Sequence, residues 1–552
     1  MTINQIKNAA DLFIAALEAE GVQYIFGVPG EENLDFMEAL RQSKIKFIVC
    51  RHEQAAVFMA ATMGRLTGKA GVALSTLGPG ATNMVTAIAH AQLGGMPLIV
   101  VTGQKPVKKS KQGRFQIIDV VAMMSPLTKF SYSINSAERI PSLVRQAFKL
   151  AESERPGAAH LELPEDIAAE PTSLKPITPV AVRRPGPDPE AIAKAVKMIS
   201  QASRPIVLVG NGANRKRVRK HLQKFVDKTK IPFVTTQMGK GVLDETSPNY
   251  IGNTALSSGD YVHCALQKAD LIITLGHDIT EKPPVILTPH ERKVIHINFY
   301  ESEVDNVYVP ALEVIGDIAH SLWALTQKIK PNKKWDWSYF YQMRDKLLKS
   351  TSVKADSKSW PFKPQRLVSD LRKIIPASGI LCLDNGMYKL WVARSYPAIE
   401  QNTVLLDNAL ATMGAGLPSA MAAKILYPKK EVVALVGDGG FMMNSQELET
   451  AVRLKLNLTV IILTDYGYGM IKWKQKGAGY KNYGLEFSNP NFVKYAEAYG
   501  AKGYKIKRAA DFSVILKKCL KLKGVKLIDC PIDYSENELV FNKELKEIKC
   551  DL

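Results

Sequence analysis

The sequence predicts an α/β protein built from three doubly wound domains with parallel sheets. At 552 residues the chain is too long for one hydrophobic core, and three domains of ordinary size account for its length. Short apolar runs that resemble buried strands end in glycine-rich turns and are followed by helical patterns. We therefore expect domains at residues 1–168, 190–325 and 364–552, joined by linkers.

The composition excludes several classes of protein. No apolar run reaches the roughly 18 residues of a membrane helix, and the N-terminus lacks the basic and apolar regions of a signal peptide. The six cysteines show no paired or CxxC spacing, and the nine histidines show no HxH or HExxH pattern. We therefore expect no disulfide or zinc framework, and a reducing cytoplasm fits this cysteine usage.

The net charge of +20 has two interpretations. A basic surface supplies most non-specific affinity for nucleic acid. The basic residues are spread along the chain, however, with only short clusters such as Lys108–Lys111 and Arg215–Lys220. Because no aromatic-interleaved basic motif or DNA-reading module accompanies them, a solvated basic surface is favoured, and it suits a small anionic substrate.

The first domain carries a candidate functional glutamate. Strand Gln23–Gly27 ends in a turn that contains Gly30, and strand Ile45–Cys50 is followed by Arg51-His52-Glu53 and an alanine-rich helix, Gln54–Arg65. Glu53 therefore lies where a strand passes into a helix. On this pattern alone, Glu53 is an acid in the first turn that complements the helix dipole.

A second glycine-rich turn follows strand Ala70–Ser75. The residues Gly78–Asn83 (GPGATN) predict a helix that opens at Thr82, ahead of a further buried strand, Leu98–Thr102. Backbone N–H groups at such a helix start serve a polar ligand. Tight packing of strand against helix explains the glycines equally well.

The middle of the chain contains two predicted linkers and an α/β unit. Six prolines in Pro171–Pro189 predict an extended linker. Strand Pro205–Val209 is followed by Gly210–Ala213, a GxGA pattern that by itself indicates a dinucleotide only weakly. Residues 326–365 are rich in lysine and tryptophan and predict a second linker with helical parts.

The third domain opens with strand Gly379–Leu383, which ends in a loop at Asp384–Tyr388. Its central stretch begins with an apolar run, Val432–Val436, which predicts a strand ending in the turn Gly437–Gly440. Asn444 and Glu447 then predict a helix start with a capping box.

A second apolar run, Leu458–Leu463, stops at Thr464-Asp465. Strand, helix and strand in this order form a right-handed crossover of a parallel sheet, which places Asp438 and Asp465 at the same carboxyl edge. Two carboxylates beside a glycine-rich turn suit Mg²⁺, which shares its shell with phosphate oxygens. The alternative is a pair of aspartates that cap ordinary turns.

The whole stretch resembles the thiamine-diphosphate motif, in which Gly-Asp-Gly is followed at this spacing by Asn-Asn. Here Gly437-Asp438-Gly439 is followed by Thr464-Asp465, and catabolic acetolactate synthases commonly carry aspartate at the second position. The resemblance implies that Asp438, Asp465 and the backbone carbonyl of Gly467 bind Mg²⁺.

The first domain carries the same resemblance. FGVPG, RHEQAAVFMA and GVALSTLGPGATN match, in order and spacing, the pyrimidine-binding domain of acetolactate synthase-like enzymes. The resemblance implies that Glu53 hydrogen-bonds the aminopyrimidine of thiamine diphosphate and that Gln116 reaches a neighbouring active site. It implies that Met413, within NALATMGAGL, separates the two rings of the cofactor, although a methionine among alanines is also ordinary core filler.

Trp473 is the candidate for substrate selection. In the family, the segment after Tyr468-Gly469-Met470 lines the acceptor side, and catabolic members have an aromatic or apolar residue matching Trp473. The alternative is a tryptophan that packs its helix against the sheet. The remaining cofactor contacts that the resemblance implies are Gly30, Gly386, Met387, Gly437, Gly439, Gly440, Tyr468 and Met470.

FAD is not expected. Biosynthetic relatives hold it in the central domain through a further glycine-rich segment and an arginine, and Gly252–Ser258 and Leu275–Asp278 lack both. The stretch His277–Pro284 resembles the flavin-free catabolic enzymes. We therefore interpret the central domain as structural.

Overall, the resemblance implies an acetolactate synthase that decarboxylates pyruvate and joins the product to a second pyruvate. It implies a cytoplasmic homodimer or homotetramer with shared active sites and without nucleic-acid or membrane partners. Another thiamine-diphosphate-dependent decarboxylase or carboligase, and a non-catalytic cofactor-binding regulatory protein, remain open. No internal repeat is detected, but the family leads us to expect one topology for the first and third domains.

Overall fold

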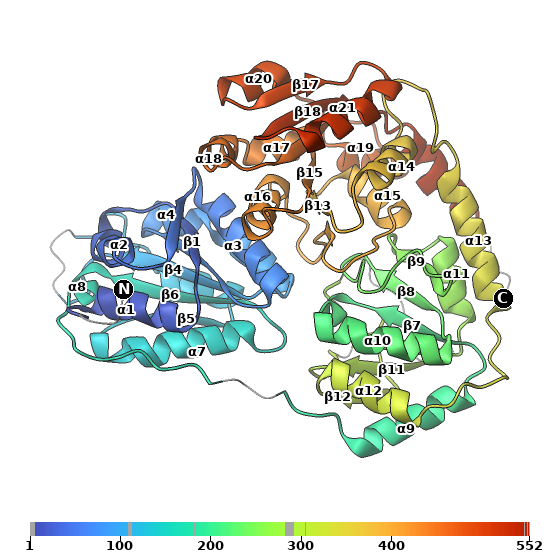
Figure 1. Ribbon diagram of the computed structural model, residues 1–552, viewed down its shortest axis with the longest axis horizontal. Coiled ribbons are helices and arrows are strands. Elements are labelled where there is room, and N and C mark those ends of the chain that lie inside the picture. The colour runs from blue at the N-terminus through green and yellow to red at the C-terminus, as the bar shows by residue number, and fades with distance from the viewer. Residues whose placement is uncertain are drawn as a thin grey trace. The chain divides into compact units, whose positions relative to one another are not determined.

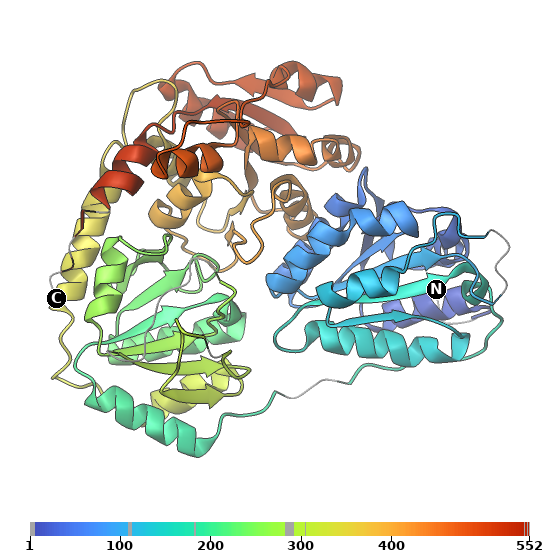
Figure 2. The same ribbon diagram turned by 180° about the vertical axis from the view of Figure 1, so that it is seen from behind.

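The computed structural model describes residues 6–108, 113–180, 184–281, 292–303, 305–545, 547–548 and 550. These residues form three six-stranded sheets with helices around them, which confirms the predicted α/β fold class (Figures 1 and 2). The chain divides into two compact units, which we describe separately. The first unit comprises Met1–Val182, Leu410–Pro428 and Met442–Leu456, and the second comprises Arg183–Ala409, Lys429–Phe441 and Asn457–Leu552.

The sheet of the first unit is parallel and lies between two layers of helices. Its strands are β1 (Tyr24–Gly27), β2 (Lys46–Val49), β3 (Gly71–Ser75), β4 (Leu98–Gln104), β5 (Phe130–Ser133) and β6 (Ala158–Pro164). Its helices are α1 (Ala9–Ala19), α2 (Leu34–Arg41), α3 (Glu53–Thr67), α4 (Gly78–Asn83), α5 (Val85–Leu93), α6 (Val120–Met124), α7 (Ile140–Glu152) and α8 (Glu165–Ala168). Alternate strand residues such as Val72, Leu74 and Ile99 form a core with α1, α2 and α7.

The second unit contains the central and the C-terminal sheets. The central strands are β7 (Pro205–Val209), β8 (Phe233–Thr236), β9 (Tyr250–Thr254), β10 (Leu271–Leu275), β11 (Lys293–Asn298) and β12 (Leu312–Ile315). The helices around them are α9 (Pro189–Gln201), α10 (Lys216–Thr229), α11 (Tyr261–Lys268), α12 (Ile318–Lys328) and α13 (Ser338–Ser352). Val207 and Val209 of β7 pack with α9, α10 and α12, whereas Ile206 and Leu208 pack with α11 and α13, so the sheet is doubly wound.

The C-terminal sheet has strands β13 (Ile380–Leu383), β14 (Val404–Leu405), β15 (Val432–Gly437), β16 (Thr459–Thr464), β17 (Lys502–Lys505) and β18 (Lys526–Pro531). Helices of this part of the chain are α14 (Pro364–Ile374), α15 (Met387–Ser395), α16 (Gly416–Leu426), α17 (Asp438–Met443), α18 (Glu447–Arg453), α19 (Gly469–Gly477), α20 (Phe492–Ala498) and α21 (Ala509–Lys521). The π-helical segment η5 (Glu538–Glu544) follows β18. Helices α16 and α18 belong to the first unit, where α16 packs on α3.

The first and third sheets share one topology, as the resemblance led us to expect. Their strand orders are β2-β1-β3-β4-β6-β5 and β14-β13-β15-β16-β18-β17, which become identical when the strands of each sheet are counted from its own first strand. In both sheets the order reverses between the first and third strands, and the crevice at such a reversal is where doubly wound sheets bind ligands.

Three local predictions are wrong. The GPGATN helix begins at Gly78 rather than Thr82, because Pro79 fits the first turn of a helix. Residues 438–440 are the first turn of α17 rather than a separate turn. The stretch 326–365 is no mere linker, because Phe340 and Met343 of α13 are buried in the core of the central domain.

Two predicted segments lie partly outside the described residues. In the proline-rich stretch, residues 172–180 and 184–188 form neither helix nor strand, and residues 181–183 are not described. The flavin-free resemblance covers His277–Pro284, of which residues 282–284 are not described. None of the helices in the described parts of the chain has the length and apolar character that crossing a bilayer requires.

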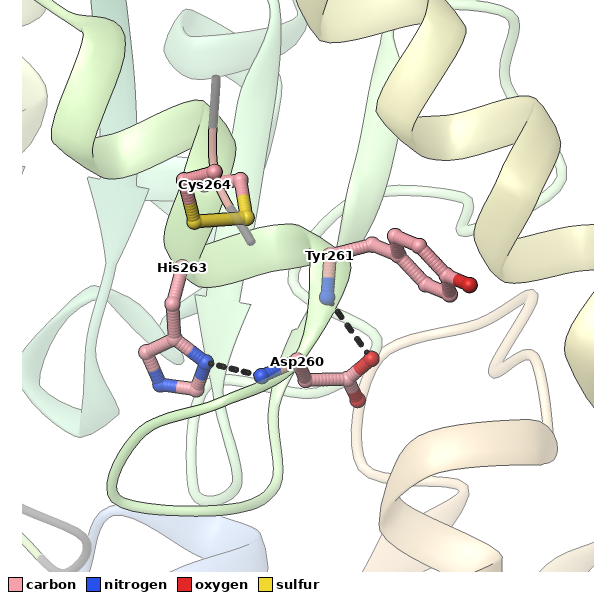
Figure 3. Close-up of a disulfide and its surroundings, with 5 residues drawn as sticks. Asp260, Tyr261, His263 and Cys264 are labelled. Carbon is pink, nitrogen blue, oxygen red and sulfur yellow. Dashed lines mark hydrogen bonds between the residues drawn. A yellow bond between two sulfur atoms is a disulfide. The ribbon is translucent and has the colours of Figure 1, made fainter. Parts of the chain in front are cut away.

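The sequence led us to expect no disulfide framework, and the structure contains a disulfide that the cysteine spacing did not indicate. Cys264 of α11 is bonded to Cys550, 286 residues further along the chain, and their Cα atoms lie 5.1 Å apart (Figure 3). Short spacing patterns cannot reveal such a pair, because only the folded chain brings it together. Cys50, Cys382, Cys519 and Cys530 are buried and are not part of this disulfide.

Candidate active site

Two neighbouring strand ends of the C-terminal sheet bring Asp438 and Asp465 together, as predicted. Strands β15 and β16 are parallel neighbours, and Asp438 and Asp465 directly follow them. The Asp438 carboxylate accepts the backbone N–H groups of Asp465 at 3.2 Å and Tyr466 at 2.8 Å. Burial, together with the charge of Asp438, raises the pKa of Asp465 to about 7. Two facing carboxylates of this kind are stabilised by a cation between them.

The third predicted metal ligand is a backbone carbonyl. The carbonyl of Gly467 accepts the N–H of Gly469 at 3.0 Å, and a carbonyl oxygen has a second lone pair. Tyr466 reaches this turn with a φ of 55°, a backbone conformation that is costly for a non-glycine residue and is typical of functional sites. Among the described residues, no group of three or more histidine, cysteine, aspartate or glutamate side chains is arranged to hold a metal ion. The candidate donors are therefore all oxygens, which suits Mg²⁺.

Asn489, in the loop before α20, was missed by the sequence analysis. Its Nδ2 donates to Oδ2 of Asp438 at 2.8 Å, and its own Oδ1 is buried without a hydrogen-bond partner. An unpaired buried oxygen next to a carboxylate pair is a natural acceptor for a metal-bound water. Only the folded chain brings Asn489 to Asp438, and we found no spacing pattern that signals it.

The loop after β13 borders the same strand end. The Tyr388 hydroxyl accepts the N–H of Gly437 at 3.1 Å, and burial raises the pKa of Tyr388 well above its ordinary value. A Cβ on Gly440 would come within 2.6 Å of Asp384, and one on Gly386 would come within 2.5 Å of the Tyr388 ring. The Met387 side chain is buried in the core, so only the backbone of this residue can contact a ligand.

The segment around α19 carries the remaining predicted contacts of this unit. Tyr468 packs against Phe487, and a Cβ on Gly439 would meet the Tyr468 ring at 3.0 Å. Met470 is partly buried against the domain core. Trp473 lies 5.9 Å from the Phe541 ring between centroids, and its indole N–H is buried without an acceptor. This contact supports the packing interpretation of Trp473 and leaves a second role open.

Glu53 lies in the first unit, at the start of α3. It is 9% exposed, and its Oε2 accepts the Nδ2–H of Asn83 at 2.9 Å. Its Oε1 faces Gly80, where a Cβ would lie 3.4 Å away. The GPGATN motif therefore supplies a donor to Glu53 and a glycine that packs closely against Ser75, Thr76 and this carboxylate. Asn83 was not singled out from the sequence, although it belongs to a motif that was.

The other predicted residues of the first unit surround neighbouring strand ends. A Cβ on Gly30 would overlap the side chain of Thr76, which follows β3. Gln116 is exposed with a φ of 59°, and its carbonyl lies where a Cβ on Gly78 would approach to 2.7 Å. Met413 is partly buried and precedes Gly414, whose φ is +89°.

The predicted capping box at Asn444 and Glu447 is wrong. The Asn444 side chain donates to Gln54 and to the carbonyl of Gly414. The Glu447 carboxylate accepts the backbone N–H groups of Arg51 at 2.8 Å and His52 at 3.0 Å. Both side chains therefore brace the chain on either side of Glu53 instead of capping their own helix, a role that local spacing does not encode.

Three family descriptions match the chain in order. The N-terminal TPP binding domain of thiamine pyrophosphate enzymes matches residues 7–123, their central domain matches 192–325, and their C-terminal TPP binding domain matches 384–530. The chain belongs to the thiamine pyrophosphate enzyme family. Within this family, the two sheets of shared topology are the two cofactor-binding domains, and thiamine diphosphate is the cofactor of the protein.

Relatives within the thiamine pyrophosphate enzymes extend over the whole chain. The chain is 32% identical to an acetolactate synthase of Bacillus subtilis (strain 168), over 96% of this chain and 94% of the relative. It is 32% identical to a catabolic acetolactate synthase of Raoultella terrigena, over 98% of this chain and 97% of the relative. A probable acetolactate synthase large subunit of Methanococcus aeolicus is also 32% identical, over 96% of this chain and 92% of the relative.

The residues of the second unit fit the diphosphate end of the cofactor. The glycines at 386, 437, 439 and 440 lie at strand ends and helix starts where an added Cβ would meet a neighbouring side chain, so a side chain at these positions would disturb the packing around the two aspartates. The adjacent oxygens of Asp438 and Asp465 suit the cation that a diphosphate requires. The family motif thus coincides with a site whose shape and charge suit its cofactor.

Proposed function

We propose that the protein is an acetolactate synthase, which decarboxylates one pyruvate and joins the remaining two carbons to a second pyruvate. Matches to synthases over at least 95% of the chain support this reaction. The observation that carries it is the buried Glu53 carboxylate, oriented by Asn83 at the start of α3. A non-catalytic binding protein has no need of a carboxylate held in this way.

The bound cofactor supplies an electron sink for breaking and forming carbon–carbon bonds. The protein's own residues hold it and move protons. Asp438, Asp465 and the Gly467 carbonyl would hold Mg²⁺, and Met413 would contact the cofactor. Because Asn83 occupies Oε2 of Glu53, its Oε1 is the atom that shares a proton with the aminopyrimidine.

Product analysis after pyruvate turnover tests this function. We expect 2-acetolactate and CO₂ in a 1:1 ratio when the purified protein receives pyruvate, thiamine diphosphate and Mg²⁺. Acetaldehyde as the main product would assign the protein to the decarboxylases. Cofactor binding without CO₂ release would identify a non-catalytic binding protein.

We further propose that the central domain binds no flavin. Its strand order, β9-β8-β7-β10-β11-β12, is that of a dinucleotide-binding sheet, with its crevice between β7 and β10. There the carboxylate of Glu281 accepts the N–H of Asn211 at 2.8 Å, the kind of donor that a dinucleotide phosphate uses. A Cβ on Gly210 would lie 2.6 Å from the same carboxylate, so the crevice is filled by the chain itself. A purified protein with stoichiometric flavin would contradict this proposal.

Glu281 gives this proposal a pH signature. Burial raises its pKa from 4.5 to about 7. Because the folded pKa is the higher one, the contribution of Glu281 to stability is complete below pH 4.5 and is lost as pH rises through about 7. In the wild type we expect the thermal unfolding temperature to fall between acidic and alkaline pH, because ionising the buried Glu281 costs on the order of 3 kcal/mol of folding free energy. Glu281→Gln removes the titrating group and should therefore make this fall smaller.

The measurement is the unfolding temperature of both proteins across this pH range. Glu245→Gln is a matched control, since Glu245 is buried in the same domain and keeps its charge partner Lys240 at 2.6 Å. If the unfolding temperature of the Glu281→Gln variant falls as steeply with pH as that of the wild type, Glu281 is not the group that titrates.

The acceptor is proposed to be pyruvate. An aromatic wall at Trp473 crowds an extra methylene, and one methylene is worth about 10- to 200-fold in discrimination. We expect the enzyme to prefer pyruvate over 2-ketobutyrate as acceptor by at least about tenfold. Trp473→Leu should reduce this preference. The product ratio in mixtures of the two keto acids measures it.

Phe541→Leu is the matched control for Trp473→Leu, because it loosens the same ring contact and leaves Trp473 in place. Equal effects of both substitutions would show that Trp473 acts through packing alone. A strong preference for 2-ketobutyrate in the wild type would instead move the protein to the biosynthetic branch.

We also propose a cytoplasmic homodimer or homotetramer that has no nucleic-acid or membrane partner and shares active sites between subunits. Large apolar side chains are exposed in the loops and helices that carry site residues of both units, and exposed apolar patches of this kind mark interfaces. These side chains are Phe115, Ile117, Ile118, Met442, Met443, Tyr466, Ile471, Tyr480 and Tyr483. Light scattering during gel filtration tests this proposal, and a monomer with full activity would contradict it.

A further inference from the structure

The chain beyond β18 connects the two domains of the second unit. Phe541 of η5 is buried and stacks near Trp391 of α15, at 4.7 Å, and near Trp473 of α19. Ile548 then packs against both the C-terminal core and the central core. The described end of this segment, Cys550, is covalently bonded to Cys264 in α11. We call residues 533–550 the tail.

The anchor of the tail is itself firmly placed. Asp260, the N-cap of α11, accepts the N–H of Tyr261 at 2.8 Å, and Nδ1 of His263 accepts the N–H of Asp260 at 3.3 Å (Figure 3). The Asp260 carboxylate also forms an ion pair with Arg394 of α15 at 2.7 Å, with both side chains 1% exposed. The disulfide therefore ties the tail to a helix that is fixed to α15, the helix that begins at the candidate diphosphate loop.

The cysteines outside the disulfide are poorly suited to thiol–disulfide exchange. Burial raises the pKa of Cys519 to about 11 and raises the pKa values of Cys50 and Cys530 above the ordinary range. A thiol must lose its proton to react, so such cysteines are inert. Cys550, in contrast, is partly exposed and is bonded to a buried partner, Cys264.

We propose that the Cys264–Cys550 bond is a redox-modification site whose oxidised form locks the tail onto Trp391 and Trp473, and whose reduction by a dithiol releases the tail and weakens substrate binding beside α19. In a cytoplasmic protein, disulfides are usually transient and redox-sensing. The effect on substrate binding rests on the proposed synthase function, whereas the release of the tail does not.

The chemical step is an ordinary exchange. A thiolate of the dithiol attacks the sulfur of Cys550, the more exposed residue of the pair, which forms a mixed disulfide and expels the Cys264 thiolate. The second thiol of the reductant then attacks the reductant sulfur that is bonded to Cys550, and the Cys550 thiolate leaves. The disulfide gains two electrons, the two cysteine thiolates take up two protons, and the dithiol becomes an intramolecular disulfide.

Thiol counting on the full chain tests the bond directly. Protein equilibrated with oxidised glutathione, denatured and alkylated should show four modified thiols, those of the cysteines outside the disulfide, and six after treatment with dithiothreitol. Cys550→Ser should show the same number before and after treatment. Six modified thiols in the oxidised wild type would overturn the proposal.

Release of the tail is measured by limited trypsin digestion and by tryptophan fluorescence. Reduction should speed cleavage within the tail by about tenfold or more and should change the emission of the wild type, with full reversal on reoxidation. Cys550→Ser should be unaffected by dithiothreitol, and Cys519→Ala, a control that keeps the disulfide, should respond like the wild type. Equal responses of wild type and Cys550→Ser would overturn the proposal.

The kinetic comparison completes the test. Reduction should raise the KM for pyruvate of the wild type several-fold, and the KM of Cys550→Ser should not change with reductant. A KM that is the same in both redox states would overturn the regulatory role. If the protein turns over no pyruvate at all, the synthase function fails, and the thiol and protease measurements still decide whether the tail is redox-controlled.

Discussion

Asp438→Ala is expected to abolish Mg²⁺-dependent retention of thiamine diphosphate, and with it activity. Asp438 has two roles at once: it is a candidate metal ligand, and its carboxylate accepts the N–H groups of Asp465 and Tyr466 and the amide of Asn489. Removing it leaves a divalent cation without a carboxylate and four donors without their acceptor, since the N–H of Gly439 also donates to this carboxylate. Charged hydrogen bonds of this kind contribute about 1.5–3 kcal/mol each, so the cofactor affinity should fall by at least about 100-fold.

Equilibrium titration with thiamine diphosphate, at fixed Mg²⁺ and with Mg²⁺ removed by a chelator, measures this loss. Asp529→Ala is a matched control, because Asp529 lies on the neighbouring strand β18 and binds Thr464 and Lys505 instead of the metal set. The control should lose some stability and keep its cofactor affinity. Unchanged affinity in Asp438→Ala would remove Asp438 from the metal site.

Glu53→Gln is expected to fold, to bind the cofactor and to lose about 10²–10⁴-fold in turnover, the usual contribution of a general acid–base group. An amide has nearly the same shape as the carboxylate, and its oxygen still accepts the N–H of Asn83. What it cannot do is share a proton with the aminopyrimidine. The loss should therefore appear in kcat, while the cofactor affinity changes by much less.

Glu447→Gln is the comparison for this experiment. Glu447 is also buried, burial raises its pKa, and it contacts the backbone next to Glu53. Its substitution should reduce thermal stability and cost less in kcat, because Glu447 positions the turn without reaching the cofactor. If the two variants lose the same activity, or if Glu53→Gln stays within a few-fold of wild type, Glu53 is only a residue of the helix start.

Much of this architecture was predictable because its signals are local. Strand Pro205–Val209 was placed to the residue, and strands β15 and β16 were placed to within one residue at each end, since buried parallel strands form continuous apolar runs. The edge shared by Asp438 and Asp465 followed from the parallel strands that a strand–helix–strand crossover joins. The topology shared by the first and third sheets required the family resemblance, because no residue pattern repeats.

The residues that escaped prediction act at long range. Asn489 reaches Asp438 from 51 positions away, and Glu447 reaches Arg51 from 396. Polar side chains of this kind carry no periodicity, and the local surroundings of Glu447 suggested a capping box. The pairing of Cys264 with Cys550 is invisible for the same reason, since a bond between residues 286 apart leaves no trace in spacing.

The composition of the first unit from three stretches of chain has a consequence for biosynthesis. Helix α3 packs on α16, where Thr62 donates to Ser419 at 3.0 Å, and α18 contacts the end of β2, where Arg453 donates to the carbonyl of Val49 at 2.6 Å. A ribosome adds about 5–20 residues per second, so the interval between Val182 and Leu456 lasts on the order of tens of seconds. Throughout that time the nascent first domain lacks α16 and α18, so the face of α3 that packs on α16 in the folded unit has no partner yet.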